Sequence, residues 1–107
     1  MIKVITICGS MRFADEMEKE AERLTEHGYV VKLPIKNGRD KYTESELEAM
    51  HREKILSSDA ILVFNIGGYI GDSTRKEIQY AEYKGVDVLY KEEEDNNGTD
   101  EEENNES

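Results

Sequence analysis

Four short runs of apolar residues, separated by amphipathic segments, set the pattern of this chain. The first run, residues 2–8, is almost continuous and rich in β-branched side chains, which is typical of a strand covered on both faces. Residues 29–33, 60–64 and 86–90 form three similar runs, and Pro34 cannot continue the second as a strand. The run at 60–64 is the most apolar, so we expect it at the centre of a sheet.

The segments between the strands carry helix signals. Between residues 13 and 27 apolar side chains recur at helical spacing on one stripe: Phe13, Met17, Ala21 and Leu24. Gly28 follows as a stop signal. Thr43 and Glu46 have the spacing of a capping box, which predicts a second helix running to about Ser57.

A third helix is expected to begin at Ser73 or Thr74 and to end near Gly85. Strands and helices that alternate in this way imply right-handed crossovers and a parallel sheet with helices on both faces. The predicted fold is therefore a Rossmann-like or flavodoxin-like three-layer α/β sandwich whose parallel sheet has four or five strands. Ligands of such sheets bind at the carboxyl ends of the strands.

Charge changes the picture mainly at the carboxyl end. The net charge is −11, but residues 91–107 hold nine acids and one base, which leaves −3 for residues 1–90. We therefore expect one domain over 1–90 and a disordered acidic tail over 91–107, acting either as a solubilising end or as an interaction arm. A domain without a basic patch is not expected to bind duplex nucleic acid.

Cysteine content and hydropathy indicate the compartment. Cys8 is the only cysteine, so an intramolecular disulfide is impossible, and its apolar surroundings suit a buried thiol in a reducing setting. No run approaches the ~20 apolar residues that span a bilayer, and no secretory signal is present. We expect a cytoplasmic protein that does not bind membranes.

The turn after the first strand could hold an anion. Gly9 lets a ligand approach the backbone, and amides at a helix start favour negative charge. Ser10 offers a hydroxyl, and Arg12 offers a positive charge that would favour a phosphorylated substrate. The same residues also fit a plain turn, with Ser10 as a helix cap and Arg12 in solvent.

The connection after the third strand, residues 65–77, is longer than a strand-to-helix link requires. Its three glycines and its aromatic ring suggest a loop shaped around a ligand, with Tyr69 stacking on a base or sugar. The candidate contacts are Asn65, Gly68, Tyr69, Gly71, Ser73 and Thr74. Glu77 has two interpretations: the last residue of a capping box that begins at Thr74, or a functional carboxylate.

Three segments together resemble the nucleoside 2-deoxyribosyltransferase superfamily, over nearly all of residues 1–90: ITICGSMRF, HREKILSSDAILVFN and GGYIGDSTRKEIQYAEYKG. The resemblance implies that Glu77 is the nucleophile that attacks the anomeric carbon of a 2-deoxyribonucleoside. The turn from Gly9 to Arg12 is similar to the Gly-Ser-Ile-Arg turn of the deoxynucleoside 5′-monophosphate N-glycosidases. A family acid or serine falls on Gly71, beside Asp72 and Ser73, and a family aspartate is matched by His51.

The implied activity is cleavage or transfer of an N-glycosidic bond, in a 2′-deoxynucleoside or its 5′-monophosphate. Glu77 would form a glycosyl ester, and Asp72 or His51 would handle the proton of the base. The sugar or phosphate would contact Gly9, Ser10, Arg12, Ser73 and Thr74. No cofactor is required, and the sequence shows no His/Cys cluster for a metal. The resemblance also implies a homodimer or higher homo-oligomer.

Two alternatives stay open. The same scaffold could be a non-catalytic nucleotide-binding protein, acting as a sensor or by sequestration. The pair Gly67-Gly68 and the segment from Thr74 to Glu77 also resemble a loop of the cytokinin-activating phosphoribohydrolases, which act on ribonucleotides.

Overall fold

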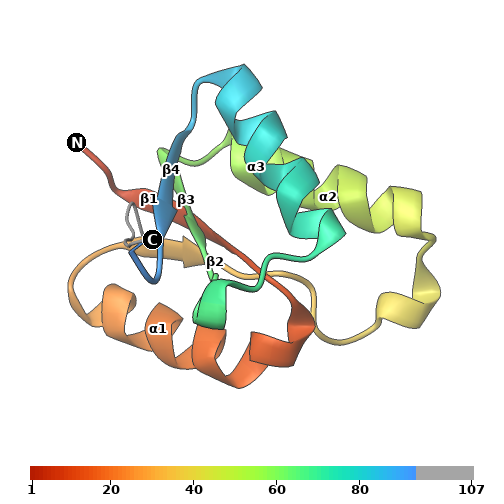
Figure 1. The fold of residues 1–107 in the computed structure, drawn as a ribbon, viewed down its shortest axis with the longest axis horizontal. Helices are drawn as coiled ribbons and strands as arrows, with labels where there is room; N and C mark the ends of the chain where they lie inside the picture. Colours follow the sequence, from red (N-terminus) through yellow and green to blue (C-terminus); the bar gives the residue numbers. More distant parts are fainter. Residues whose placement is uncertain (94–107) are drawn as a thin grey trace, which may run out of the picture.

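The computed structural model describes residues 1–93, and these form one parallel sheet in the order β2-β1-β3-β4 (Figure 1). The strands are β1 (Val4–Cys8), β2 (Val30–Lys32), β3 (Ala60–Val63) and β4 (Asp87–Tyr90). The α-helices are α1 (Ala14–Glu26), α2 (Glu44–Leu56) and α3 (Asp72–Lys84). Single 3₁₀ turns lie at Met11–Phe13, Arg39–Lys41 and Ile66–Gly68. The greater part of the predicted acidic tail, from residue 94 onward, lies outside the described residues.

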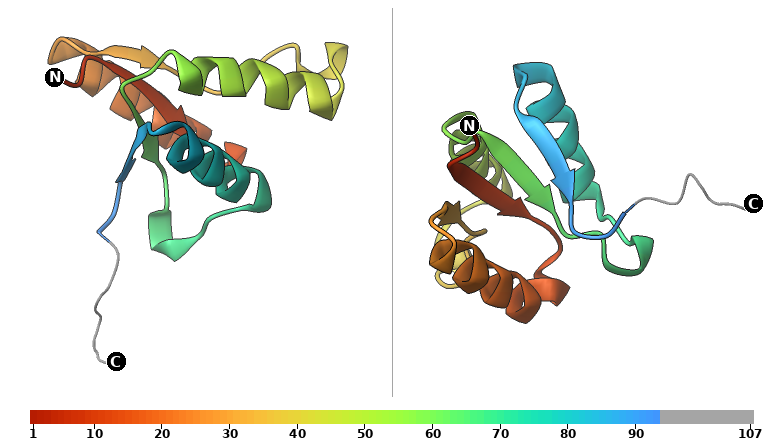
Figure 2. Two further views of the ribbon diagram at one scale, coloured as in Figure 1. Left: turned by 90° about the horizontal axis from the view of Figure 1, so that it is seen from above. Right: turned by 90° about the vertical axis from the view of Figure 1, so that its left-hand side faces the viewer.

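The helices lie on both sides of the sheet, which confirms the predicted Rossmann-like sandwich. Figures 1 and 2 show α1 on one face and α2 with α3 on the other. Alternate residues of β1 pack against the helices on opposite faces of the sheet. Ile5 and Ile7 pack with Met17 of α1, whereas Cys8 packs with Ile55 of α2. Within the described residues, no helix combines the length and the hydropathy needed to cross a membrane.

The carboxyl ends of β1 and β3 adjoin at the point where the strand order reverses. β2 pairs with one edge of β1 and β3 with the other. Cys8 lies opposite Val63, and the amide of Phe64 donates to the Cys8 carbonyl oxygen at 2.8 Å. The two loops that follow these strands therefore start side by side, where ligands of open parallel sheets bind.

The two helix starts differ in how well the sequence predicted them. The capping box of α2 is confirmed: the Glu46 amide donates to Thr43 Oγ1 at 3.1 Å, and the Thr43 amide donates to Glu46 Oε1 at 2.8 Å. The predicted box at the third helix is wrong, because α3 begins at Asp72 with Gly71 as N-cap. Thr74 is buried inside the first turn, so Glu77 lies in the second turn and has no capping role.

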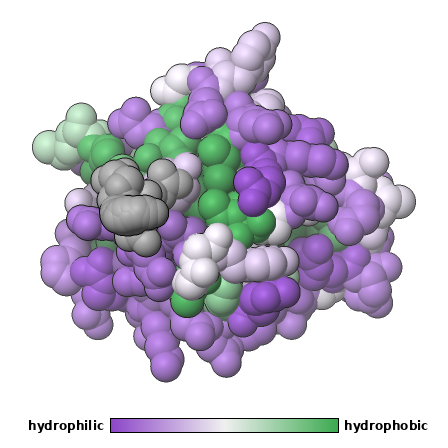
Figure 3. All heavy atoms as spheres, viewed as in Figure 1, coloured by the Kyte–Doolittle hydropathy of each residue, from purple (hydrophilic) through white to green (hydrophobic). Residues whose placement is uncertain are grey.

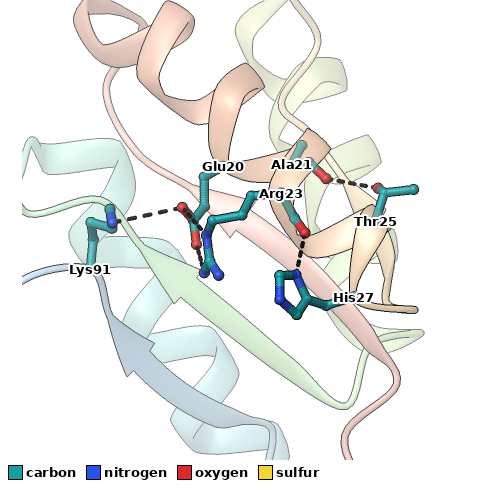
Figure 4. A network of polar contacts seen from close by, with 6 residues as sticks. All are labelled: Glu20, Ala21, Arg23, Thr25, His27 and Lys91. Atoms are coloured by element: carbon teal, nitrogen blue, oxygen red, sulfur yellow. Dashed lines mark hydrogen bonds and ion pairs between the residues drawn. The ribbon is translucent and has the colours of Figure 1, made fainter.

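A buried acid fastens α1 to the segment after β4 (Figure 4). Glu20 accepts hydrogen bonds from Arg23 on Oε1 at 3.2 Å and on Oε2 at 2.6 Å, and Lys91 Nζ lies 3.7 Å from Oε1. The hydrogen bonds from Arg23 hold the pKa of Glu20 below its ordinary value despite burial. The pairing keeps the carboxylate charged, which makes its burial against the sheet tolerable.

The face shown in Figure 3 is mostly hydrophilic, with a strip of hydrophobic residues beside β4 in the middle of the view. β4 is an edge strand, and its Leu89 remains 40% exposed. An apolar residue on an unpaired strand edge is compatible with self-association. The homodimer implied by the family resemblance remains a prediction.

Candidate functional site

A cavity of about 320 Å³ opens at the carboxyl ends of β1 and β3, between α2 and the start of α3. Its wall contains nine of the residues singled out from the sequence: Gly9, Ser10, His51, Tyr69, Gly71, Asp72, Ser73, Thr74 and Glu77. The carboxylate of Glu77 and the turn after β1 thus face the same space. The volume lies at the lower end of the range for small-molecule sites.

Arg12 does not line the cavity. Its guanidinium carbon is 3.8 Å from the centre of the Tyr69 ring, and Phe13 packs edge-on against the same ring at 6.2 Å. Tyr69, which lines the cavity, is therefore held in place by a cation and an aromatic ring. Arg12 supports the wall through this ring.

Asn65 and Gly68, also predicted to contact substrate, shape the loop instead of lining the cavity. The Asn65 amide nitrogen donates to the Glu92 carbonyl oxygen at 3.0 Å, and the Glu92 amide donates to Asn65 Oδ1 at 2.8 Å. The Gly67 amide donates to Glu92 Oε1 at 3.1 Å. Gly68 has a φ of +80°, which favours glycine.

Sequence reasoning named only His51 from one wall of the cavity. α2 presents Glu44, Leu47, Glu48 and His51 to it, at the spacing of one helical stripe. That spacing was visible in the sequence, but the sequence analysis used only the capping box and His51 of this helix. The segment after β2, interpreted only as a loop, contributes Pro34, Ile35 and Arg39.

Gly9 serves the packing of the turn itself. A β-carbon at this position would lie 2.9 Å from the β-carbon of Phe64 and 3.2 Å from Met17 Sδ. Such a contact is closer than side chains tolerate without displacement. The glycine therefore lets β1 end against β3 at the cavity floor, in addition to leaving space in the wall.

Three chemically reactive side chains meet at the base of the cavity, each from a different element. Cys8 Sγ at the end of β1 lies 3.4 Å from His51 Nε2 of α2, which lies 3.6 Å from Glu77 Oε2 of α3. The sulfur, nitrogen and carboxylate oxygen lie within 4.8 Å of one another. The statement that no His/Cys cluster exists is therefore wrong, because folding brings together residues far apart in sequence.

Burial governs the charges of this group. It lowers the pKa of His51 to about 4, with a smaller effect of Lys54, and it raises the pKa of Glu77 to about 7. Cys8 donates a hydrogen bond that favours the Glu77 carboxylate, and nearby Glu48 opposes it. Although 3.6 Å would suit an ion pair, both side chains are mainly uncharged between pH 4 and 7.

Burial also raises the pKa of the Cys8 thiol, and the neighbouring Glu77 adds to the effect. The thiol is therefore protonated at neutral pH and is a poor nucleophile on its own. Glu77, whose side chain is 21% exposed, is the member of the group that combines access to the cavity with ionisation near neutrality.

No protein-family model matches the chain, and no curated protein matches it. Among solved structures, a conserved protein from Enterococcus faecalis V583 superposes with a TM-score of 0.64 at 22% sequence identity. The superposition covers 84% of this chain and 63% of that protein, so this chain spans less than two thirds of its length. The likeness shows a shared parallel α/β fold.

Proposed function

We propose that the protein cleaves or transfers the N-glycosidic bond of a 2′-deoxynucleoside, with Glu77 as the nucleophile. The single observation that carries the proposal is the position of this carboxylate. It lies in the second turn of α3, has no capping role, and shares a cavity wall with the turn after β1. A carboxylate that lines the cavity and is not used to cap the helix is available for chemistry.

The cavity supplies the other functions that the reaction needs. As the base leaves, positive charge develops on the sugar ring, and a carboxylate beneath the anomeric carbon stabilises it and forms the glycosyl ester. Asp72, at the exposed first residue of α3, would protonate the leaving base. The Tyr69 ring would stack on the base or sugar, and Ser10 and Ser73 would hydrogen-bond to the sugar hydroxyl.

We propose a different role for His51 from the one that the sequence suggested. Its Nε2 atom faces both Cys8 and Glu77 at the base of the cavity, where it can orient the carboxylate. We therefore assign it as a positioning residue and leave the proton of the base to Asp72. Water or a second base would then give up a proton to Asp72 and take the sugar from Glu77, which restores both carboxyl groups to their starting states.

The test is release of free base from the four deoxynucleosides and their monophosphates, followed chromatographically. Glu77→Gln keeps the shape of the side chain and should reduce release by at least about 1,000-fold, since it removes the nucleophile. Glu44→Gln, which alters another carboxylate in the wall, is the matched control and should retain most of the activity. Saturable binding of a nucleoside or nucleotide without base release would indicate a non-catalytic nucleotide-binding protein instead.

The pH dependence offers a second check. The nucleophile must be ionised, and the pKa of Glu77 is raised to about 7. Base release should therefore increase about tenfold per pH unit as pH rises toward 7 and Glu77 ionises. A rate that is flat from pH 5 to 8 would contradict the assignment of Glu77.

A further inference from the structure

We propose that Cys8, His51 and Glu77 form a binding site for a divalent cation of the zinc type. The three donors are a thiol sulfur, an imidazole nitrogen and a carboxylate oxygen, the combination that zinc and cobalt accept and that magnesium and calcium do not favour. The inference does not rest on the proposed function, because it concerns coordination and not turnover.

The spacing of the donors fits a tetrahedral ion. Bond lengths of about 2.3 Å to sulfur and 2.0–2.2 Å to nitrogen and oxygen place neighbouring ligand atoms about 3.4–3.6 Å apart. The sulfur and the imidazole nitrogen are 3.4 Å apart, and the nitrogen and the carboxylate oxygen are 3.6 Å apart. The remaining distance, from Cys8 Sγ to the Glu77 carboxylate oxygen, is at most 4.8 Å. Rotation of the Glu77 side chain can shorten it.

The surroundings also suit a cation. Cys8 is fully buried beneath the cavity, whereas His51 and Glu77 line it. An ion held by all three would have its fourth position directed to the cavity, as in zinc sites that bind water or a small ligand. A thiolate and a carboxylate would balance the two positive charges, and their protons would leave to solvent on binding.

The cation and the proposed nucleophile would compete for one side chain. While Glu77 coordinates the ion, its carboxylate cannot attack a sugar. Bound zinc should therefore suppress base release, if base release is observed. The coordination test below reads a spectrum, so its outcome is independent of whether the protein turns over nucleosides.

The experiment uses the full chain, stripped of metal and titrated with Co²⁺. Coordination by sulfur produces a thiolate-to-cobalt charge-transfer band, and Cys8 is the only residue that can supply it. The many carboxylates of residues 91–107 can bind Co²⁺ but cannot generate this band. We expect the band to saturate at one equivalent, to show the intensities of tetrahedral cobalt in the visible region, and to disappear on addition of Zn²⁺.

Variants identify the remaining ligands. His51→Gln and Glu77→Gln should each weaken Co²⁺ binding by at least about tenfold while far-ultraviolet circular dichroism shows a retained fold. His27→Gln changes the other histidine, which is exposed, and should leave the titration unchanged. Absence of the charge-transfer band in the parent protein would overturn the proposal. So would a band whose affinity is the same in folded His51→Gln and Glu77→Gln.

Discussion

At the scale of single residues, Glu77 and His51 lie side by side in a buried part of the cavity, and burial disfavours the charged form of both side chains. The folded protein holds a proton on Glu77 up to about pH 7 instead of its ordinary 4.5, and it loses the proton of His51 at about pH 4 instead of 6.5. These shifts act in opposite directions on stability. Between pH 4.5 and 6.5 their contributions nearly cancel.

Single substitutions should therefore separate the two effects. The contribution of Glu77 to the stability of the protein is complete below pH 4.5 and is lost as pH rises to about 7. The contribution of His51 is complete above pH 6.5 and is lost as pH falls to about 4. In Glu77→Gln the free energy of unfolding should rise by about 3 kcal/mol from pH 4 to 6.5, and in His51→Gln it should fall by about 3 kcal/mol from pH 4.5 to 7. Urea unfolding across this range measures both. Parallel profiles in the two variants would show that neither pKa is shifted as described.

Gly9 is the residue at which packing leaves no room for a side chain. Gly9→Ala would press a β-carbon to 2.9 Å from that of Phe64 and should cost about 1–3 kcal/mol of unfolding free energy. Gly71→Ala is the matched control. Its new β-carbon would meet only the Tyr69 side chain, with the hydroxyl nearest at 3.4 Å, and the loss should stay below about 1 kcal/mol. Equal losses in thermal or urea unfolding would contradict the packing role.

At the scale of elements, the loop between β3 and α3 is fixed at its first residue. The side chain of Asn65 pairs with both backbone groups of Glu92, just beyond the point where the Lys91 amide donates to the Val63 carbonyl oxygen at 2.8 Å. The side chain thus extends the β3–β4 pairing by one step. This attachment determines where Tyr69 and the start of α3 lie relative to the cavity.

Removal of the Asn65 side-chain amide should make the whole loop between β3 and α3 more mobile. Asn65→Ala loses two hydrogen bonds at a buried position, so unfolding free energy should decrease by about 2 kcal/mol. Hydrogen exchange at residues 65–71 should accelerate more than exchange in β1. Asn37→Ala, at an exposed asparagine in the loop before α2, serves as control. Unchanged exchange in the loop would show that the pairing does not restrain it.

At the scale of the whole molecule, the cavity is acidic. Glu44, Glu48, Asp72 and Glu77 line it, and Arg39 is the one guanidinium in the wall that the structure describes. Arg12, which the sequence suggested for a phosphate, stacks on Tyr69 and does not line the cavity. An excess of carboxylates repels a dianionic phosphate more than an uncharged sugar hydroxyl.

We therefore predict a preference for unphosphorylated nucleosides. The ratio kcat/KM for a deoxynucleoside should exceed that for its 5′-monophosphate by at least about tenfold, or about 1.4 kcal/mol. Glu48→Gln should narrow this ratio by relieving part of the repulsion, and added salt should narrow it in the parent protein. A higher kcat/KM for the monophosphate would show that the amides at the start of α3 dominate over the acidic wall.

Local patterns were sufficient for much of the architecture. The strands, the capping box of Thr43 and Glu46, and the parallel order followed from hydrophobic runs and connection lengths. The start of α3 did not, because the Thr-x-x-Glu pattern at residues 74–77 predicted a cap, whereas burial of Thr74 placed it inside the helix. Packing against the sheet outweighed a local preference worth only about 1 kcal/mol.

The candidate site, like the fold, could be predicted only in part from the sequence. The sequence by itself determined a parallel sheet with its ligand site at the carboxyl ends of the strands, since alternating strand and helix periodicities imply the parallel direction. The order β2-β1-β3-β4, which sets the loops after β1 and β3 side by side, came from the structure. Only the tertiary structure decided that Cys8, His51 and Glu77 converge, because their contacts join three elements separated by 43 and 26 positions along the chain. The tertiary structure also decided that the polar stripe of α2 lines the cavity. Such contacts depend on how helices seat on the sheet, which no local pattern encodes.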